Sequence, residues 1–264
     1  MTTRQPTRAE RRRVILSPAR AVAPSPAPPE RARTIAAYTA ASLHTVGLGS
    51  CPLLAATTSV TGDVLVVVPR SGELAAAVRR SPLGDLPARL TIVRRAALPL
   101  RDPVRGQVEL AGWLTLVAPA EEAGLVLDFA ETCPADVLLD VGLTATLLRL
   151  DLAEVVLQEG GSGTVVELEE FAAARPDPLA GREVELLGEH ARLLAELCVR
   201  VRLWAGEGDG VHVLGLDRFG VLFRVHSSRQ HPGSHYDLRV PFPAAVPDHG
   251  AFGAALRKLV ACTR

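Results

Sequence analysis

The chain of 264 residues carries a formal net charge of +0 and is 48% hydrophobic but only 4% aromatic. This length suits one large domain or two modest ones, and the core must be built mainly from Leu, Val and Ala. The zero net charge excludes a global field that would draw the protein to nucleic acid or to a membrane surface. The charge is uneven, however, because residues 1–33 hold eight Arg and two Glu, so the remainder is acidic.

Basic charge is carried almost wholly by Arg, and Lys258 is the only lysine. Together with the abundance of Ala, Pro and Gly, this composition indicates a GC-rich bacterial genome. The four Cys are far apart and form no Cys-x-x-Cys pair, and no secretory or membrane-spanning apolar run is found. We therefore expect a cytoplasmic protein with free thiols, and a disulfide-bonded protein is the weaker alternative.

Residues 1–28 are rich in Arg, Pro and Ala, which predicts a disordered basic arm because such a segment buries too little surface to become ordered. A first helix is expected from Pro29 to about Ala41, with Pro at its first turn. Strands are predicted at 43–48, 53–60, 64–68, 89–95, 107–117 and 147–157. A short helix is predicted to end near Arg80, and two further helices are predicted at 119–133 and 168–174.

In the predicted strand 107–117, apolar and polar side chains alternate, which indicates one buried and one solvated face. Trp113 belongs to the solvated set, and we expect it to pack or to lie at an interface rather than to stack on a base. The buried set is Val108, Leu110, Leu114 and Leu116, and the other set is Gln107, Glu109, Trp113 and Thr115.

The segment Arg175-Pro-Asp-Pro178 predicts a domain boundary, which separates a domain of residues 29–175 from one of residues 179–264. After this boundary, a stripe of apolar residues at helical spacing from Leu186 to Trp204 predicts one amphipathic helix that includes His190. Three short antiparallel strands are expected between Val211 and Phe242, and a final helix follows Asp248. The second domain is therefore predicted to be a small α-βββ-α module.

The predicted three-stranded sheet gathers polar side chains on one face, and His231 and His235 lie three residues apart around a Pro-Gly turn. A metal site needs three or four converging ligands, and a turn lacks the helical geometry that aligns such a pair. We interpret the face as solvated and assign no metal site. His190 is interpreted as a hydrogen-bonded core histidine, with a haem or metal ligand as the alternative.

Phosphate binding is suggested by Pro69-Arg70-Ser71-Gly72 between a strand and a helix that ends in Arg79 and Arg80. Backbone N–H groups at a helix start attract anions, and Arg binds phosphate with two parallel hydrogen bonds. The alternative is an ordinary capped helix. No Walker lysine, dinucleotide fingerprint or nucleophile elbow is found.

Three segments together resemble a known family: residues 102–114 (Asp-Pro-Val-Arg-Gly-Gln-Val-Glu-Leu-Ala-Gly-Trp-Leu), residues 147–157 and residues 171–179. They resemble the flavin-nucleotide-binding split barrels of the pyridoxamine 5′-phosphate oxidase-like family, in their haem-utilisation branch. Residues 186–260 resemble the C-terminal domain of unknown function that follows in that branch. The resemblance implies an α+β fold with a six-stranded antiparallel split β-barrel and peripheral helices. It also implies a homodimer with a flavin mononucleotide (FMN) or haem site at the dimer seam.

Flavin-binding members carry a Ser/Thr- and His-Thr-rich turn after the third strand, where this chain leaves only Arg70 and Ser71 to reach a phosphate. We therefore favour a cofactor-poor split-barrel protein that binds a small anionic ligand, haem or a protein partner. The alternative is an FMN-dependent oxidoreductase or a haem-degrading oxygenase, with Arg70 and Ser71 on phosphate or His190 or His235 on iron. A nucleic-acid binder acting through the basic arm ranks last, because the folded part is acidic.

Overall fold

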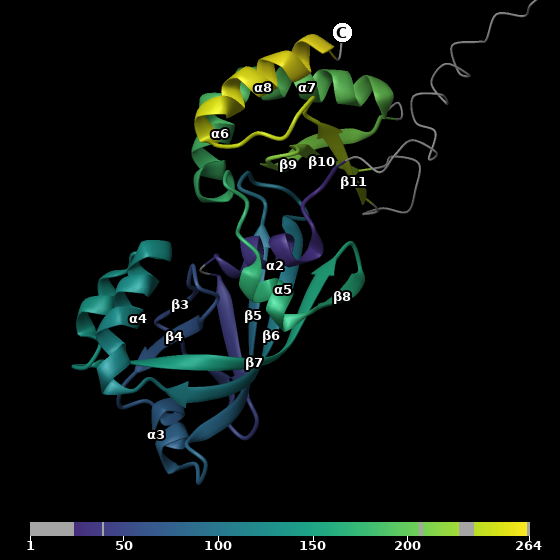
Figure 1. Ribbon diagram of the computed structural model, residues 1–264. Helices are drawn as coiled ribbons and strands as arrows, with labels where there is room; N and C mark the ends of the chain where they lie inside the picture. The colour runs from purple at the N-terminus through teal and green to yellow at the C-terminus, as the bar shows by residue number, and fades with distance from the viewer. Residues whose placement is uncertain (1–23, 39, 206–207, 227–234, 263–264) are drawn as a thin grey trace, which may run out of the picture. The chain divides into compact units, whose positions relative to one another are not determined.

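The computed structural model describes residues 24–38, 40–205, 208–226 and 235–262. They form two compact units, and each unit is described by itself below. The barrel unit spans Pro26–Asp177, and the C-terminal unit contains the described residues from Pro178 onward (Figure 1). Most of the predicted basic arm, residues 1–23, lies outside the described residues, as does His231.

In the described part of the barrel unit, eight strands form one curled antiparallel sheet in the order β2-β1-β5-β6-β7-β4-β3, with β8 paired to β7. The predicted fold class, an α+β chain with an antiparallel split β-barrel, is confirmed. Two more strands are present than the resemblance implied. The strands are β1 (Ala41–Thr45), β2 (Gly49–Cys51), β3 (Ala55–Thr58), β4 (Val64–Pro69), β5 (Asp85–Arg95), β6 (Val104–Leu116), β7 (Ala145–Glu159) and β8 (Ser162–Val166).

Helices cover the ends and one flank of this sheet. Helices α2 and α5 lie side by side at one end (Figure 1). In α2, the Glu30 carboxylate accepts a hydrogen bond from the Ala27 N–H (3.1 Å), which satisfies one of the N–H groups left open at a helix start. The helix ends at Ala36 rather than Ala41, because Ala41 begins β1. The helices of this unit are α2 (Pro28–Ala36), α3 (Glu73–Arg80), α4 (Pro119–Thr132), the 3₁₀ helix η1 (Asp136–Asp140) and α5 (Leu168–Ala173).

Strand β4 is buried on both faces, unlike a strand with one solvated side. Val64, Val66 and Val68 join the core enclosed by the curled sheet. Leu65 and Val67 face the other way, into a second apolar cluster that contains Phe129 of α4. This explains why the sequence of β4 is a continuous apolar run rather than an alternation.

In the C-terminal unit, helices flank an antiparallel three-stranded sheet in the order β11-β10-β9. The predicted α-βββ-α arrangement is confirmed, but its first helix is divided at His190 into α6 and α7. The His190 ring nitrogen Nδ1 lies 3.2 Å from the Leu186 carbonyl oxygen, and the ring packs edge-on against Phe252 of α8. The elements are η2 (Ala180–Arg182), α6 (Glu183–Glu189), α7 (Ala191–Trp204), β9 (Gly210–Asp217), β10 (Gly220–His226), β11 (His235–Pro241) and α8 (His249–Cys262).

The polar face of this small sheet is less solvated than the sequence predicted. Arg224 is only 3% exposed, and its Nε and Nη2 atoms each donate to a carboxylate oxygen of Asp237 at 2.8 Å. Arg239 pairs with Asp217, which is also buried. Cross-strand ion pairing explains how these charged groups are accommodated, because a buried cation is tolerated when a fixed carboxylate faces it.

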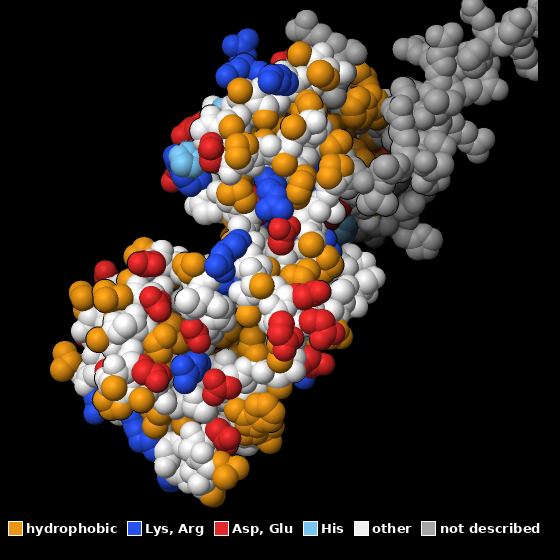
Figure 2. Space-filling model, viewed as in Figure 1, with side chains coloured by type: hydrophobic (Ala, Val, Ile, Leu, Met, Phe, Trp, Pro, Cys, Tyr) orange, Lys and Arg blue, Asp and Glu red, His pale blue; other side chains and the backbone are white. Residues whose placement is uncertain are grey.

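Acidic side chains gather over α5 and the adjoining strand ends of the barrel unit (Figure 2). Glu167 immediately precedes α5, and Glu169 and Glu170 lie in its first turn. A surface of this sign repels a phosphate backbone. Across the described residues, the model contains no helix that is both long enough and apolar enough to span a bilayer. The four Cys are all free thiols.

Candidate functional site

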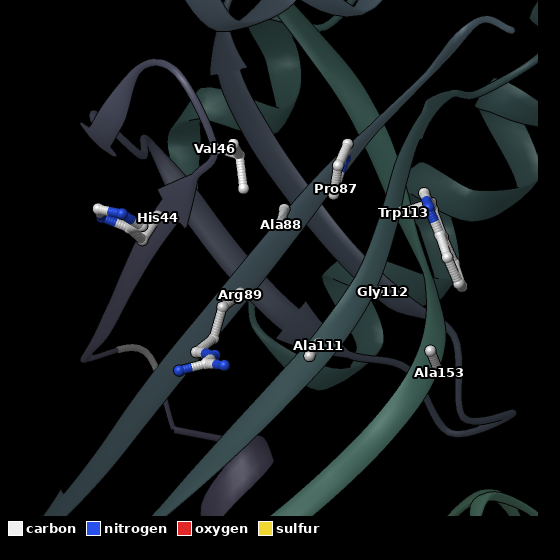
Figure 3. Close-up of a pocket in the computed structure, with 9 residues that line it drawn as sticks. All are labelled: His44, Val46, Pro87, Ala88, Arg89, Ala111, Gly112, Trp113 and Ala153. Carbon is white, nitrogen blue, oxygen red and sulfur yellow. The ribbon is translucent and has the colours of Figure 1, made fainter.

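A pocket of about 440 Å³ lies on the face of the barrel sheet that points away from its core. It extends across β1, β5, β6 and β7 (Figure 3). This volume falls in the range of small-molecule sites. The lining residues are His44, Val46, Pro87, Ala88, Arg89, Ala111, Gly112, Trp113 and Ala153.

The floor of the pocket is made of residues with small side chains, and a β-bulge places them there. Ala111 pairs with Glu154 but Gly112 pairs with Leu152, so Ala153 is an extra residue on β7. A Cβ atom at Gly112 would lie 2.0 Å from the Asp151 carbonyl oxygen, so no other residue fits between the two strands. Ala111 continues the floor on β6. Ala88 of β5 pairs with Gly112 and also lines the pocket, but its side chain belongs to the enclosed core. The result is a shallow, flat area of sheet.

Longer side chains form the walls. In Figure 3, His44 and Arg89 stand on one side of the floor and Trp113 stands on the other. His44 and Arg89 are cross-strand neighbours on β1 and β5. The Trp113 side chain is large and apolar yet 47% exposed, and Val46 is 76% exposed. An indole beside an apolar floor can stack on a flat ring, and the guanidinium can meet a negative charge at the ring's edge.

The Arg89 side chain is connected to a fixed carboxylate beside the pocket. Arg89 Nη1 lies 3.7 Å from Glu109 Oε2. The other oxygen, Glu109 Oε1, accepts hydrogen bonds from Gln107 Nε2 (3.1 Å) and Gln158 Nε2 (2.8 Å). Gln107 Nε2 also donates to Gln158 Oε1 at 3.1 Å. The carboxylate is therefore held from one side by two amides, while its second oxygen faces the arginine.

The predicted phosphate turn is found between β4 and α3, but its arginines bind backbone. The Arg70 guanidinium donates to the Gly142 carbonyl, and Arg79 Nη1 donates to the Arg70 carbonyl at 3.1 Å. Ser71 and Arg80 are exposed at opposite ends of this segment. The structure thus brings Arg70 and Arg79 together, and none of the four residues lines the pocket.

His190 and His235, the two histidines predicted as candidate haem ligands, lie in the C-terminal unit. His190 packs between α6 and α8, where a Cβ added at Gly253 would come within 2.6 Å of its Nε2. His235 begins β11 opposite His226, and their ring centroids are 5.8 Å apart. Within the described residues, no three His, Cys, Asp or Glu side chains are arranged to hold a metal ion.

Sequence reasoning missed His44 and Arg89, and it considered Trp113 only as a packing or interface residue. The alternation in 107–117 does place Trp113 on the solvated face, which was the one available signal. His44 and Arg89 are separated by 45 positions in the chain, and only the antiparallel pairing of β1 with β5 makes them neighbours.

No protein-family model and no curated protein sequence matches the chain. Among solved structures, a haem-binding protein from Mycobacterium smegmatis is 23% identical, with a TM-score of 0.56; the match covers 91% of this chain and 98% of that protein. This likeness shows that the fold of nearly the whole chain occurs in another protein.

Weaker matches include protein Atu2129 from Agrobacterium tumefaciens, of unknown function, at 17% identity and a TM-score of 0.39, covering 91% of this chain and 99% of that one. A FAD- and haem-binding protein from Mycobacterium smegmatis is 14% identical, with a TM-score of 0.35, over 55% of this chain and 77% of that one.

Proposed function

We propose that this chain is a split-barrel protein that binds a flat, largely apolar ring ligand of haem or flavin type and does not catalyse a reaction on it. The observation that carries the proposal is the floor of Ala111, Gly112 and Ala153 beside the half-exposed indole of Trp113. Small floor residues leave room for a ring to lie against the sheet, and the indole offers a stacking surface.

The pocket and the turn between β4 and α3 differ in how well they fit haem or flavin. The pocket has the apolar, flat character that a porphyrin or an isoalloxazine ring requires. The predicted phosphate turn is a poorer fit, because Arg70 and Arg79 already donate to backbone carbonyls. That a protein of the same fold is described as haem-binding supports the choice of ring.

A homodimer is proposed as the working state of the barrel unit. Val46 and Trp113 expose apolar surface beside the pocket, and a second copy could cover it. Sedimentation velocity of the purified protein tests this point. A single species at the monomer mass of 28.0 kDa would contradict it.

The enzymatic alternative is an FMN-dependent oxidoreductase or a haem-degrading oxygenase, and the observation in its favour is the imidazole of His44 at the pocket wall. A bound flavin would supply hydride transfer, and haem iron would supply oxygen activation. Loss of the haem absorbance in the presence of an electron donor, or oxidation of a reduced nicotinamide by the flavin-loaded protein, would favour this alternative over simple binding.

The direct test is titration of the purified protein with haemin and with FMN, followed by visible absorbance. We expect saturable binding of one of the two, weakened about tenfold in Trp113→Ala because stacking on an aromatic side chain contributes about 1–3 kcal/mol. Trp204→Phe is the matched control, since Trp204 is also partly exposed but lies on α7. If neither ligand binds, or if Arg70→Ala abolishes binding while Trp113→Ala does not, the pocket is not the site.

A further inference from the structure

We propose that Arg89 selects ring ligands that carry a carboxylate or phosphate on their edge, and that Glu109 sets how strongly it does so. This inference rests on the proposed function, because it concerns the same pocket. It goes further by naming the ligand feature that the pocket recognises and the residue that recognises it.

The position of Arg89 is the first argument. Its neighbours across the sheet are His44 on β1 and Ala111 on β6. Ala111 is too short to cover the guanidinium, and the Arg89 side chain remains 59% exposed. The cation therefore stands at the edge of an otherwise apolar floor. A ring lying on that floor would bring a substituent at its rim within reach of the guanidinium.

The incomplete pairing of Arg89 is the second argument. In the part of the chain that the structure describes, Glu109 is the acid that comes within ion-pairing distance of Arg89, and the separation is 3.7 Å. A bidentate arginine–carboxylate pair is shorter, at about 2.7–2.9 Å for each hydrogen bond. Most donors of the guanidinium thus remain available for a second acid, and a planar, two-oxygen group matches their geometry.

The fixation of Glu109 is the third argument. Gln107 and Gln158 donate hydrogen bonds to its Oε1, so the carboxylate is not free to rotate into a bidentate pair with Arg89. Glu109 thus holds the Arg89 guanidinium near the pocket through a long ion pair that occupies few of its N–H donors. Glu109 is therefore a positioning residue, and its negative charge competes with the acid of the ligand for the same cation.

The experiment compares acidic and neutral forms of one ring: protoporphyrin IX with its dimethyl ester, and FMN with riboflavin. Binding is measured by quenching of Trp fluorescence in the full chain. For the ring that binds, we expect the acidic form to bind at least tenfold more tightly than the neutral form. Arg89→Gln should remove this preference while leaving the neutral form unaffected.

Glu109→Gln separates recognition from a structural role. The amide keeps the shape of the side chain and removes the competing charge, so we expect the acidic ligand to bind severalfold more tightly. A purely structural role would instead weaken both ligands. Arg192→Gln, an exposed arginine on α7, is the matched control and should change neither affinity.

The outcomes distinguish the two proposals. Equal affinity for the acidic and neutral forms, unchanged in Arg89→Gln, overturns this inference and leaves the proposed function standing. Absence of binding by either ring overturns both. A circular dichroism melt of each variant confirms that it is folded, which is expected because Arg89 is largely exposed.

Discussion

The guanidinium carbon of Arg33 lies 5.3 Å from the centre of the Phe171 ring, so a cation from α2 stacks on an aromatic side chain from α5. Arg33 is only 1% exposed. It donates to the Ser59 carbonyl at 2.7 Å and to the Ala174 carbonyl at 3.3 Å. Three segments far apart in the chain are thereby fastened by one side chain at the end of the barrel.

Arg33→Ala should lower the free energy of unfolding by about 2–4 kcal/mol, because it leaves buried carbonyl groups without donors and opens a cavity under Phe171. Urea denaturation followed by circular dichroism measures the change. Arg31→Ala on the same helix is the control. Arg31 pairs with Glu159 at 2.8 Å but is partly exposed, so its loss should cost less than about 1 kcal/mol. Equal losses for the two variants would contradict the role of Arg33.

The same residue predicts a pH dependence. Burial, and then the nearby charge of Arg175, lower the pKa of Arg33 to about 10. The folded state therefore disfavours the charged form, and this penalty is relieved as the pH rises above about 10. Between pH 8.5 and 11, the wild-type protein should gain stability relative to Arg33→Met. A constant difference across this range would argue against the lowered pKa.

Gly112→Ala should be strongly destabilising, because the new methyl group would lie 2.0 Å from the Asp151 carbonyl oxygen and would force β6 and β7 apart. We expect a loss of about 3 kcal/mol or more in the free energy of unfolding, as for other overpacked sites. Gly124→Ala is the opposite control. Gly124 lies inside α4 with open space around it, so alanine there should stabilise by about 0.5–1 kcal/mol.

Asp237→Asn in the C-terminal unit should cost about 2–3 kcal/mol, because it removes the bidentate partner of the buried Arg224. Thermal unfolding by calorimetry measures this loss. The exposed pair of Arg182 and Glu185 provides the comparison, and Glu185→Gln should change stability by less than about 1 kcal/mol. A small effect of Asp237→Asn would show that the sheet tolerates Arg224 without this carboxylate.

The four thiols should differ in reactivity. Burial raises the pKa of Cys133 and that of Cys198, although the nearby Arg202 partly offsets the rise at Cys198. A raised pKa leaves less thiolate at pH 8, and thiolate is the reactive form. Cys262 is exposed and should be alkylated first, whereas buried Cys51 should react last. Timed iodoacetamide labelling with mass spectrometry gives the order, and early labelling of Cys198 would contradict it.

The sequence predicted the long strands well where one face is buried. The alternating strand predicted at 107–117 is found as β6, and the strand predicted at 147–157 is found within β7. Strand β8 was missed, because Ser162–Val166 is exposed along most of its length and so shows no apolar alternation. The division at His190 of the first long helix of the C-terminal unit, into α6 and α7, was also missed. The stripe of apolar residues continues through the break, so periodicity alone could not locate it.

The pocket could not be predicted from local patterns. Its floor depends on an extra residue in β7 that shifts the pairing with β6 at Gly112, and its walls come from β1, β5 and β6. The prediction of a phosphate-binding turn did not include Gly142. This residue lies 72 positions from Arg70, and its carbonyl oxygen accepts a hydrogen bond from the Arg70 guanidinium. In both cases the deciding partner comes from a remote strand or loop.

Strand β4 has no solvated side, and this has a consequence for how the barrel unit opens. A fluctuation that frees its amides must disrupt the enclosed core and the packing under α4 together. Local fraying therefore cannot expose this strand, and hydrogen exchange there should proceed only through complete unfolding of the unit. Two hydrophobic clusters that look separable are thus bound into one cooperative whole by five consecutive aliphatic side chains.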